Sequence, residues 1–493
     1  MTVQDLIRPP TAEARKADLT PQKHAFLANA EANARHRDAW TVKNAAYYED
    51  DLRYMRFLVR EYARVLDLGC GTGRLLAALK PAYGVGVDLS PAMVAEAEAK
   101  HPDLHFLVGD AEDPICLSQL ESPFDYIILS DTIGMLDDIE TAMKGLHHLC
   151  NSDTRIILSY FSTYWEPALN LATKIGWRMP QPEMNHLTTS DFVNILRLSD
   201  FETIRMEWRQ IMPARLLGLG RLLNRFVAPL PLIRNFCLRT YVVARSRRAQ
   251  TPSKPSTTIL IPCRNEEGNI ERAIREMPRF GGHQEIIFVE GNSKDRTLEE
   301  CLRVQQAYAG QWDIKVLKQD GKGKGDAVRK GFEAATADIL MILDADLTVP
   351  PAALPRFYDA IATGKGEFIN GTRLVYPMEG DAMRFLNHIA NRVFAILFSY
   401  LLNQRFTDTL CGTKVLKRDA YLRIVNARSY FGDFDPFGDY DLIFGAVKQN
   451  LCIAEVAVRY KARTYGETQI SRFRDGMLLI RMVIFAFRKL KAI

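Results

Sequence analysis

The sequence predicts an α/β protein with two domains in series. Its 493 residues exceed the roughly 150 residues of an average domain, so one hydrophobic core is not enough. Strand-like apolar runs alternate with helical segments in two separate regions, a rhythm typical of parallel sheets. Between these regions, the segment SRRAQTPSKPST (246–257) mixes Pro, Ser and basic residues, as linkers do.

The composition is that of a globular protein. The hydrophobic fraction of 47% and charged fraction of 25% argue against a disordered, collagen-like or polytopic membrane protein. A net charge of +5 is too small to indicate nucleic-acid binding, and no groove-reading motif appears, so we expect no nucleic-acid partner. The 8 cysteines form no C-x-x-C pair, which disfavours a zinc ribbon or disulfide scaffold and indicates a reducing, cytoplasmic compartment.

No membrane-crossing or secretory segment is expected. The N-terminal residues lack the apolar stretch of a secretory signal. The longest uncharged apolar run, 393–402, is about half of the ~20 residues that span a bilayer.

Residues 1–40 are polar and Ala-rich, and predict an arm without functional side chains. Residues 41–245 are predicted to form the first domain. It opens with a helix at 40–60, where aromatic and apolar residues recur at helical spacing. Strands are then expected at 64–68, 84–89, 104–108, 126–130 and 155–160.

The second predicted domain spans 258–493 and ends in a basic amphipathic segment. Its strands are expected at 258–261, 285–289, 315–317 and 339–343. No internal repeat relates the two domains.

The first candidate site follows the strand at 64–68. The run VLDLGCGTGRLL places three glycines at a helix entrance, where the backbone can approach a ligand: Gly69, Gly71 and Gly73. Asp88 ends the next strand, 88 − 69 = 19 residues later, a spacing at which a carboxylate meets a ribose diol. Asp110 ends the third strand. Helix N-capping is the alternative role for both carboxylates. Asp67 precedes the loop, and its charge favours a cationic ligand over a pyrophosphate.

The runs DLGCGTG, VGVDLSPAMV, VGDAED and FDYIILSDTIGMLDD resemble the successive motifs of class I S-adenosylmethionine (SAM)-dependent methyltransferases. The resemblance covers about residues 40–245 and implies a Rossmann-like fold with SAM as cofactor. It implies that Asp67 and the backbone of Gly69, Gly71 and Gly73 hold the methionine part, Asp88 the ribose, Asp110 and Ala111 the adenine, and Ser130 the sulfonium side.

The methyl acceptor is left open. No Asn-Pro-Pro-aromatic motif of amide or base methylation appears. His186 is a candidate base, with a capping or solvent-facing role as the alternative. Tyr47 and Tyr48 are expected either to cap the pocket or to pack in the core.

The second candidate site gathers at strand ends in the second domain. Asp344 and Asp346 end the very apolar strand of ILMILDADLTVPP, where two buried carboxylates repel unless a cation neutralises them. Their oxygens suit Mg²⁺ or Mn²⁺, and capping is the alternative. Lys322 and Lys324 lie in the glycine-rich run KQDGKGKGD, where flexible point charges can meet phosphate.

Together with TTILIPCRNEEGNI and EIIFVEGNSKDRT, these motifs resemble family 2 glycosyltransferases of the GT-A fold, in particular dolichyl-phosphate mannose synthases, over 257–482. The resemblance implies a nucleoside held by Pro262, Arg264, Glu266 and Glu290. It implies that Asp344 and Asp346 bind ribose and the metal that bridges the diphosphate, and that the sugar is transferred with inversion.

The acceptor end of this site is less defined. Asp441 stands where the family has an acidic residue, so it is the candidate general base, with Asp408 and Asp439 as rivals. A phosphate acceptor would need no base and would meet Arg373, Arg392 or Arg463, whose alternative role is ordinary ion pairing. Glu290-Gly291 replaces the usual Asp-Asp, which leaves the choice of UDP- or GDP-sugar open. Cys411-Gly412-Thr413 replaces Ser-Gly-Phe, which leaves the acceptor open.

Two basic, apolar segments resemble membrane-surface elements. Residues 211–248 hold eight arginines and no acidic residue among Leu, Phe and Pro, and 471–493 is similarly basic. The alternative is core helices with solvated arginines. A peripheral position at the inner face of the cell membrane would suit a glycan or lipid-linked acceptor.

The function expected from both sites is a bifunctional methyltransferase and glycosyltransferase. One alternative makes the first domain a non-catalytic SAM-binding or docking module. Another makes it a dehydrogenase, although the GxGxG loop weighs against nicotinamide binding.

Overall fold

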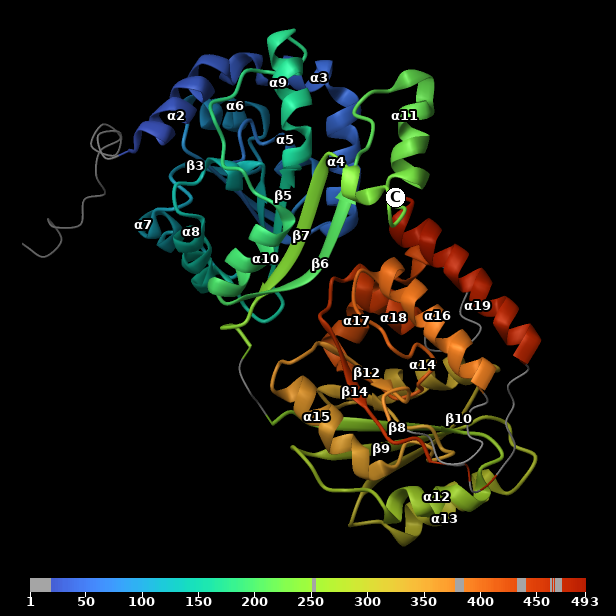
Figure 1. The fold of residues 1–493 in the computed structure, drawn as a ribbon. Helices are drawn as coiled ribbons and strands as arrows, with labels where there is room; N and C mark the ends of the chain where they lie inside the picture. The colour runs from blue at the N-terminus through green and yellow to red at the C-terminus, as the bar shows by residue number, and fades with distance from the viewer. Residues whose placement is uncertain are drawn as a thin grey trace, which may run out of the picture. The chain divides into compact units, whose positions relative to one another are not determined.

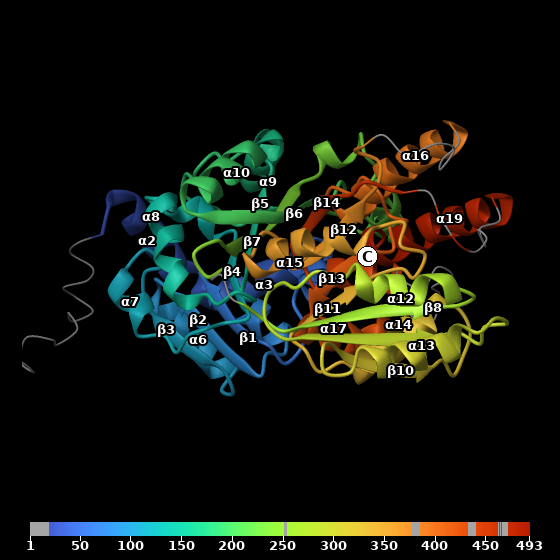
Figure 2. The ribbon, with the colours of Figure 1, turned by 90° about the horizontal axis from the view of Figure 1, so that it is seen from below.

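The computed structural model describes residues 19–250, 254–376, 385–431, 440–461, 463, 465 and 472–493. The chain divides between Ala249 and Gln250 into two compact α/β units, each with its own sheet (Figures 1 and 2). This confirms the predicted fold class of two α/β domains in series. Within the described residues, no helix combines the length and apolar character needed to cross a bilayer.

The first unit is built on a seven-stranded sheet in the order β3-β2-β1-β4-β5-β7-β6. Its strands are β1 (Arg64–Leu68), β2 (Tyr83–Asp88), β3 (His105–Val108), β4 (Tyr126–Ser130), β5 (Arg155–Phe161), β6 (Phe201–Arg209) and β7 (Arg239–Ser246). The first five lie within one residue of the predicted strands and pair in parallel.

Helices cover both faces of this sheet. They are α2 (Pro21–Asn33), α3 (Arg37–Lys43), α4 (Ala45–Leu58), α5 (Arg74–Ala78), α6 (Pro91–Lys100), α7 (Pro114–Ser118), α8 (Ile139–Gly145), α9 (Glu166–Lys174), α10 (Thr189–Leu198) and α11 (Leu219–Leu222). Figure 2 shows α6 on one side of the strands and α10 on the other. An apolar core of buried strand residues lies between the layers.

The predicted parallel pairing holds for β1 to β5, and two strands that were not predicted, β6 and β7, add an antiparallel edge. β7 pairs antiparallel with both β5 and β6. The same strand corrects part of the membrane-surface expectation, because every residue of β7 is buried. Arg239 and Arg245, whose side chains are 1% exposed, form ion pairs inside the unit and do not face solvent.

The second unit has a sheet in the order β10-β9-β8-β11-β13-β12-β14. Its strands are β8 (Thr257–Cys263), β9 (Gln284–Glu290), β10 (Asp313–Lys318), β11 (Ile339–Ile342), β12 (Phe368–Thr372), β13 (Lys414–Lys417) and β14 (Ile453–Ala457). The four predicted strands, β8 to β11, are present within two residues. β13 is antiparallel to its neighbours β11 and β12, so this sheet is mixed as well.

The helices of the second unit pack on a second apolar core. They are α12 (Glu267–Arg275), α13 (Thr297–Ala307), α14 (Lys324–Ala334), α15 (Leu354–Ala362), α16 (Phe385–Leu402), α17 (Arg418–Asn426), α18 (Tyr440–Lys448) and α19 (Arg472–Ala486). In Figure 1, α12 and α13 lie below β8 and β9, and α14 lies above them.

Both sheets reverse their strand order at one point. In the first unit this happens between β1 and β4, and in the second between β8 and β11. At such a switch point the loops leave adjacent strands in opposite directions and open a crevice at the carboxyl ends, where ligands of open α/β sheets bind. The topology therefore places a crevice beside the glycine loop of one unit and beside Asp344 and Asp346 of the other.

Candidate active sites

The crevice of the first unit is a cavity of about 140 Å³ that opens to solvent. Its wall includes six of the predicted cofactor residues: Gly69, Gly71, Asp88, Asp110, Ala111 and Ser130. The other two lie behind it. Asp67 is buried within β1, and Gly73 precedes α5 in a left-handed conformation.

The glycine loop needs glycine at its first position. Gly69 has a φ of +76°, and a Cβ there would lie 2.2 Å from Oγ1 of Thr132. That hydroxyl donates a hydrogen bond of 2.7 Å to the carbonyl of Leu68. The loop therefore passes close to the start of the segment after β4, and the close approach fixes one edge of the cavity.

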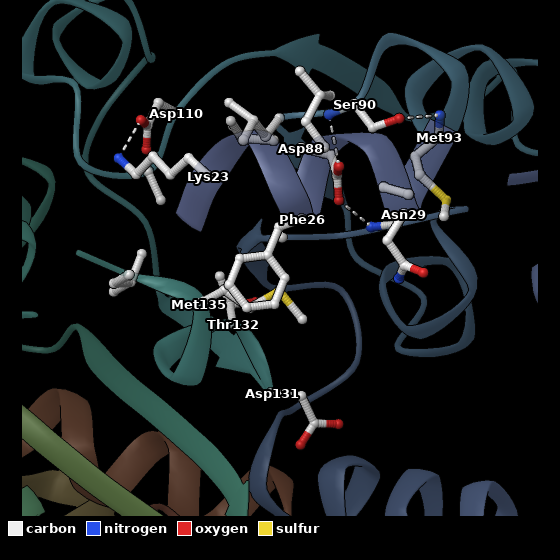
Figure 3. Close-up of a pocket in the computed structure, with 18 of the residues that line it drawn as sticks. Lys23, Phe26, Asn29, Asp88, Ser90, Met93, Asp110, Asp131, Thr132 and Met135 are labelled. Carbon is white, nitrogen blue, oxygen red and sulfur yellow. Dashed lines mark hydrogen bonds and ion pairs between the residues drawn. The ribbon is translucent and has the colours of Figure 1, made fainter. Parts of the chain in front are cut away.

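Asp88 holds the loop to the next strand. One of its carboxylate oxygens accepts a 2.8 Å hydrogen bond from the backbone N–H of Gly71, and the other accepts one of 3.0 Å from that of Ser90 (Figure 3). Ser90 caps α6, and Asp113 caps α7. The alternative role of Asp88 and Asp110 as helix N-caps is therefore taken by other residues.

Burial raises the pKa of two carboxyl groups beside the glycine loop. Burial raises the pKa of Asp67 to about 7, and the charges of Asp88 and Asp51 add to the effect. Burial also raises the pKa of Asp88. Since a cationic ligand would favour the ionised form of each carboxyl, the electrostatics of the crevice suit a positively charged guest.

Helix α2 forms a wall of the cavity that sequence reasoning missed. Lys23 on this helix forms ion pairs with Asp110, with Glu112 (2.6 Å) and with Asp137 (3.7 Å). Phe26, one turn on, lies over Met135 on the opposite wall (Figure 3). The pair Thr20-Pro21 is a helix-start signal in the sequence, since Thr20 caps α2, but nothing in the sequence shows where the helix packs.

Asp131 lines the cavity beyond Ser130 and was also missed. It is a non-glycine residue with a φ of 62°, and such strained backbone is concentrated at functional sites. Both of its carboxylate oxygens accept hydrogen bonds from Arg239, at 3.1 and 3.0 Å. Arg239 also contacts Asp51 and donates to the hydroxyl of Ser159 at 2.7 Å, so Asp131 stands at the end of a buried charged network.

Three other predicted residues do not line this cavity. His186 is exposed and pairs with Glu166 at 3.1 Å, which matches the solvent-facing alternative. Tyr47 contacts Arg239, and Tyr48 packs against the guanidinium of Arg74 at 4.9 Å from its ring. The packing alternative therefore describes both tyrosines.

In the second unit, each aspartate after β11 meets one basic side chain. Asp344 pairs with Lys324 at 2.6 Å, and Asp346 pairs with Arg463 at 2.6 Å. Both aspartates are half-buried. Burial raises the pKa of Asp344, but the nearby charges of Lys324 and other basic groups together outweigh it, so the pKa lies below its ordinary value.

Gly412 leaves room for the Asp344–Lys324 pair. A Cβ at this position would lie 1.8 Å from Oδ2 of Asp344 and 2.5 Å from Nζ of Lys324. The sequence Cys411-Gly412-Thr413 departs from the Ser-Gly-Phe of the family but keeps the glycine, which this geometry requires.

The residues predicted to hold a nucleoside lie at the ends of β8 and β9 and in the segment after β8. Glu266 is buried, accepts a 2.7 Å hydrogen bond from Asn269, and lies 3.7 Å from Arg463. Burial raises its pKa. Glu290 is buried and accepts a hydrogen bond from the backbone of Ser293. Pro262 is the second-last residue of β8, and Arg264 and Lys322 are exposed. Of the residues predicted to bind the sugar donor, Glu266 and Asp346 are brought together, because Arg463 contacts both.

The candidates for the general base, Asp408 and Asp441, differ in burial and in their partners. Asp408 is 2% exposed, and both of its oxygens accept hydrogen bonds from Arg373, at 2.6 and 2.9 Å. Burial raises the pKa of Asp408, but Arg373 outweighs this and lowers it overall. Asp441 is half-buried in the first turn of α18 and lies 3.3 Å from Arg428. Asp439 lies outside the described residues.

The residues present fit a divalent metal only if substrate phosphates share its coordination with the two aspartates. In the described part of the chain, no three His, Cys, Asp or Glu side chains gather at one point. Mg²⁺ and Mn²⁺ accept one or two carboxylates and complete their coordination with water and substrate phosphates. Asp344 and Asp346 supply oxygens of the right kind, and a metal there would have to arrive with a diphosphate.

Both units match known families. Residues 23–205 match the family "Methyltransferase domain", and residues 258–424 match "Glycosyl transferase family 2". These matches confirm the resemblances stated from the motifs.

Curated relatives include two proteins of Haloferax volcanii. "Glycosyltransferase AglJ" is 27% identical over 230 residues, which are 46% of this chain and 71% of the relative. "Dolichyl-phosphate hexose transferase" is 28% identical over 221 residues, which are 45% of this chain and 89% of the relative. A solved SAM-dependent methyltransferase from Thermotoga maritima, a possible histamine N-methyltransferase, is 18% identical with a TM-score of 0.35, covering 45% of this chain and 99% of its own.

Proposed function

Because the chain joins a SAM-dependent methyltransferase domain to a family 2 glycosyltransferase domain, we propose that it is a bifunctional enzyme. One unit transfers a methyl group from SAM. The other transfers a sugar, with inversion and metal dependence, from a UDP- or GDP-sugar to a glycan, glycolipid or polyprenyl-phosphate acceptor. The observation that carries the proposal is that each sheet has carboxylates at its switch point, and that those of the first unit line a cavity.

In the first unit, Asp67 and the glycine loop hold the methionine part of the cofactor, and Asp88 holds the ribose. Asp110 and Ala111 flank the adenine, and Ser130 borders the sulfonium. When bound, SAM supplies a methyl group on a positively charged sulfur. Asp131 lines the same cavity, so we propose that it acts on the methyl acceptor. Its carboxylate orients the hydroxyl or amine of the acceptor and takes the proton that this group loses.

In the second unit, Lys324 and Arg463 neutralise the two aspartates. We propose that these basic groups turn to the diphosphate of the donor when a metal occupies Asp344 and Asp346. The metal, when bound, stabilises negative charge on the leaving diphosphate. Pro262, Arg264, Glu266 and Glu290 surround the nucleoside, and Lys322 lies in the glycine-rich turn next to the phosphates.

The acceptor distinguishes two roles for Asp441. With a hydroxyl acceptor, Asp441 acts as the general base, because Asp408 is buried as well as bound by Arg373, whereas Asp441 is half-buried. With a polyprenyl-phosphate, the nucleophile is already anionic and needs no base. The relative named dolichyl-phosphate hexose transferase supports the second case. We therefore favour a lipid-linked phosphate acceptor, reached at the cytoplasmic face of the membrane.

The proposal is tested by ligand binding and turnover. S-adenosylhomocysteine (SAH) and a mixture of UDP or GDP with Mn²⁺ should each raise the melting temperature by mass action. Asp346→Ala should abolish metal-dependent sugar transfer while SAH still binds. Sugar transfer that is unchanged in this variant would refute the assignment of the Asp344–Asp346 pair. SAH binding without any methyl transfer would instead favour a docking role for the first unit.

A further inference from the structure

The first unit carries an exposed apolar surface on the segment between β6 and β7. We name it the 214–236 surface, and its exposed large side chains are Leu216, Leu217, Leu219, Leu222, Phe226, Leu230, Leu232 and Phe236. Leu217 is fully exposed, Leu232 is 83% exposed and Phe236 is 67% exposed. Contiguous apolar side chains at this exposure mark an interaction site on a soluble protein.

The charge of this surface indicates its partner. Between residues 211 and 238 there are four arginines and no Asp, Glu or Lys. Arg221 and Arg225 are exposed among the leucines of α11 and the turn that follows it. Leucine and phenylalanine with interspersed arginine, and no acidic residue, is the pattern of segments that lie in the headgroup region of anionic bilayers. A symmetric contact between two copies would instead bring the same positive charges together.

Hydrogen bonds within the segment and an ion pair to α4 hold its backbone to the rest of the first unit, and its apolar side chains are exposed. The buried side chain of Asn224 accepts hydrogen bonds from the backbone of Ile211 (3.0 Å) and Met212 (2.9 Å) and donates one to Met212 (2.8 Å). Arg215 pairs with Glu49 on α4 at 2.7 Å. Figure 1 shows α11 beside α4 at the edge of the first unit.

A neighbouring segment extends the surface. The indole N–H of Trp165 donates a 2.8 Å hydrogen bond to the carbonyl of Phe236, which ties the start of α9 to the end of the 214–236 surface. Tyr164 beside it is 81% exposed, and Trp177 after α9 is 67% exposed. Exposed tyrosine and tryptophan are enriched where proteins meet the bilayer interface.

The surface lies next to the acceptor side of the methyl-transfer crevice. The backbone N–H of Ser162, directly after β5, donates a 2.7 Å hydrogen bond to the carbonyl of Leu238. Arg239, three residues after Phe236, binds Asp131 on the cavity wall. The residues that directly follow the 214–236 surface, Leu238 and Arg239, therefore contact the segments after β5 and β4.

From these contacts we infer that the 214–236 surface docks the first unit on an anionic lipid bilayer, and that the methyl acceptor is a lipid-linked saccharide presented from that bilayer. The docking follows from the surface itself, whereas the acceptor class rests on the proposed methyl transfer. Docking brings the wall that contains Asp131 to the headgroup region, where a lipid-linked saccharide is displayed.

The test is co-sedimentation of the full chain with two kinds of vesicle, phosphatidylcholine alone and phosphatidylcholine with added phosphatidylglycerol. We expect binding to the second kind that weakens with salt. Arg221→Glu with Arg225→Glu, and separately Leu217→Ser with Leu232→Ser, should each reduce this binding at least about tenfold. The matched controls are Arg197→Glu and Ile115→Ser, exposed residues of the same unit outside the surface, which should bind as the parent chain does.

Equal vesicle binding by the parent chain and both double variants would overturn the inference, as would the absence of binding to anionic vesicles. Concentration-dependent dimerisation that the leucine variant abolishes, without vesicle binding, would assign the surface to a second copy and also overturn it. A thermal shift with SAH shows that each variant is folded. That shift is measured without vesicles, so its failure in the parent chain would refute the proposed function and leave the docking result to stand separately.

Discussion

Asp131 is the side chain that we propose takes the proton of the methyl acceptor in the first unit. Its backbone is strained, and the cost of this strain, about 1–3 kcal/mol, has to be balanced by the structure around it. Arg239 provides that balance by binding both carboxylate oxygens. The arrangement fixes the carboxylate at the cavity wall, on the far side of the crevice from Lys23 in Figure 3.

We predict that Asp131→Asn lowers the rate of methyl transfer on the order of 10²-fold with little change in SAH affinity. The amide keeps the size of the side chain but can no longer take a proton from the acceptor. The measurement is methyl transfer from labelled SAM to a membrane extract, together with titration of SAH. Asp153→Asn, on the turn before β5 and outside the cavity lining, is the control. A parallel loss of SAH affinity would show that Asp131 supports the cofactor pocket instead.

A second prediction concerns Asp67 and pH. Burial raises its pKa in the folded chain from 3.8 to about 7. The ammonium of SAH favours the ionised carboxylate, so SAH affinity should rise as pH increases from about 6 to 8, and Asp67→Asn should remove this dependence. Calorimetric titration at several pH values checks both. A slope that persists in the variant would assign the dependence to another group.

The same shift has the opposite effect on stability. Between pH 3.8 and about 7 the folded chain keeps a proton on Asp67 that the unfolded chain has lost. The contribution of Asp67 to the free energy of unfolding therefore falls as pH rises through this window. Relative to the parent chain, Asp67→Asn should gain stability between pH 5 and about 7 in the absence of ligand.

In the second unit, we predict that Gly412→Ala abolishes sugar transfer while the fold is kept. The added Cβ would overlap Asp344 and force the carboxylate and Lys324 apart, and a misplacement of about 1 Å at a reacting centre can cost about 10²-fold in rate. Gly476→Ala, where nothing lies within 4 Å of the added Cβ, is the matched control. Normal donor turnover by Gly412→Ala would place the diphosphate elsewhere.

Residues at strand ends were predictable from the sequence, and residues that complete the sites from a distance were not. Asp88 and Asp344 follow apolar runs, so their position at a sheet edge follows from the pattern alone. Arg239 follows no such rule, because it binds Asp131, which lies 108 positions earlier in the chain. No local pattern encodes that pairing.

At the level of elements, α2 closes one side of the crevice. Lys23 on this helix forms ion pairs with three carboxylates, those of Asp110, Glu112 and Asp137. Glu31, near the end of the same helix, accepts a 2.6 Å hydrogen bond from Ser90. The helix therefore bridges the ends of β2 and β3, where the ribose and adenine are proposed to lie.

We predict that Lys23→Met weakens SAH binding roughly tenfold, because the loss of a charge-assisted contact worth about 1.5 kcal/mol loosens the helix and leaves the carboxylates unbalanced. Lys80→Met is the control, since Lys80 forms an exposed pair with Glu61 whose removal should have little effect. Calorimetric titration of SAH measures both. Equal affinities would show that α2 covers the crevice without contributing to binding.

The missing strands show why the parallel sheets were predicted incompletely. β6 (FETIRMEWR) alternates polar and apolar residues, and the short apolar run of β7, 241–244, lies between arginines in a basic segment, so neither was identified as a strand. The arginines of β7 are buried because Asp51, Asp131 and Glu202 neutralise them. Burial of a charge depends on partners far away in the chain, and the local composition of 211–248 therefore indicated a surface where the strand is internal.

At the scale of the whole molecule, we propose that two separate crevices bind two different ligands. Each unit has its own sheet, switch point and apolar core, so each site is built from residues of one unit. Two α/β domains in series were predictable because the strand rhythm restarts after the linker. The ligands of each crevice follow from the side chains at its rim.

The most direct test is calorimetric titration of three proteins with two ligands: the parent chain, Asp88→Ala and Asp346→Ala, each titrated with SAH and with UDP or GDP in the presence of Mn²⁺. The parent chain should bind SAH and one of the nucleotides. Asp88→Ala should lose SAH alone, and Asp346→Ala should lose the Mn²⁺-dependent nucleotide alone. Loss of both ligands in either folded variant, or binding of neither ligand by the parent chain, would contradict the account.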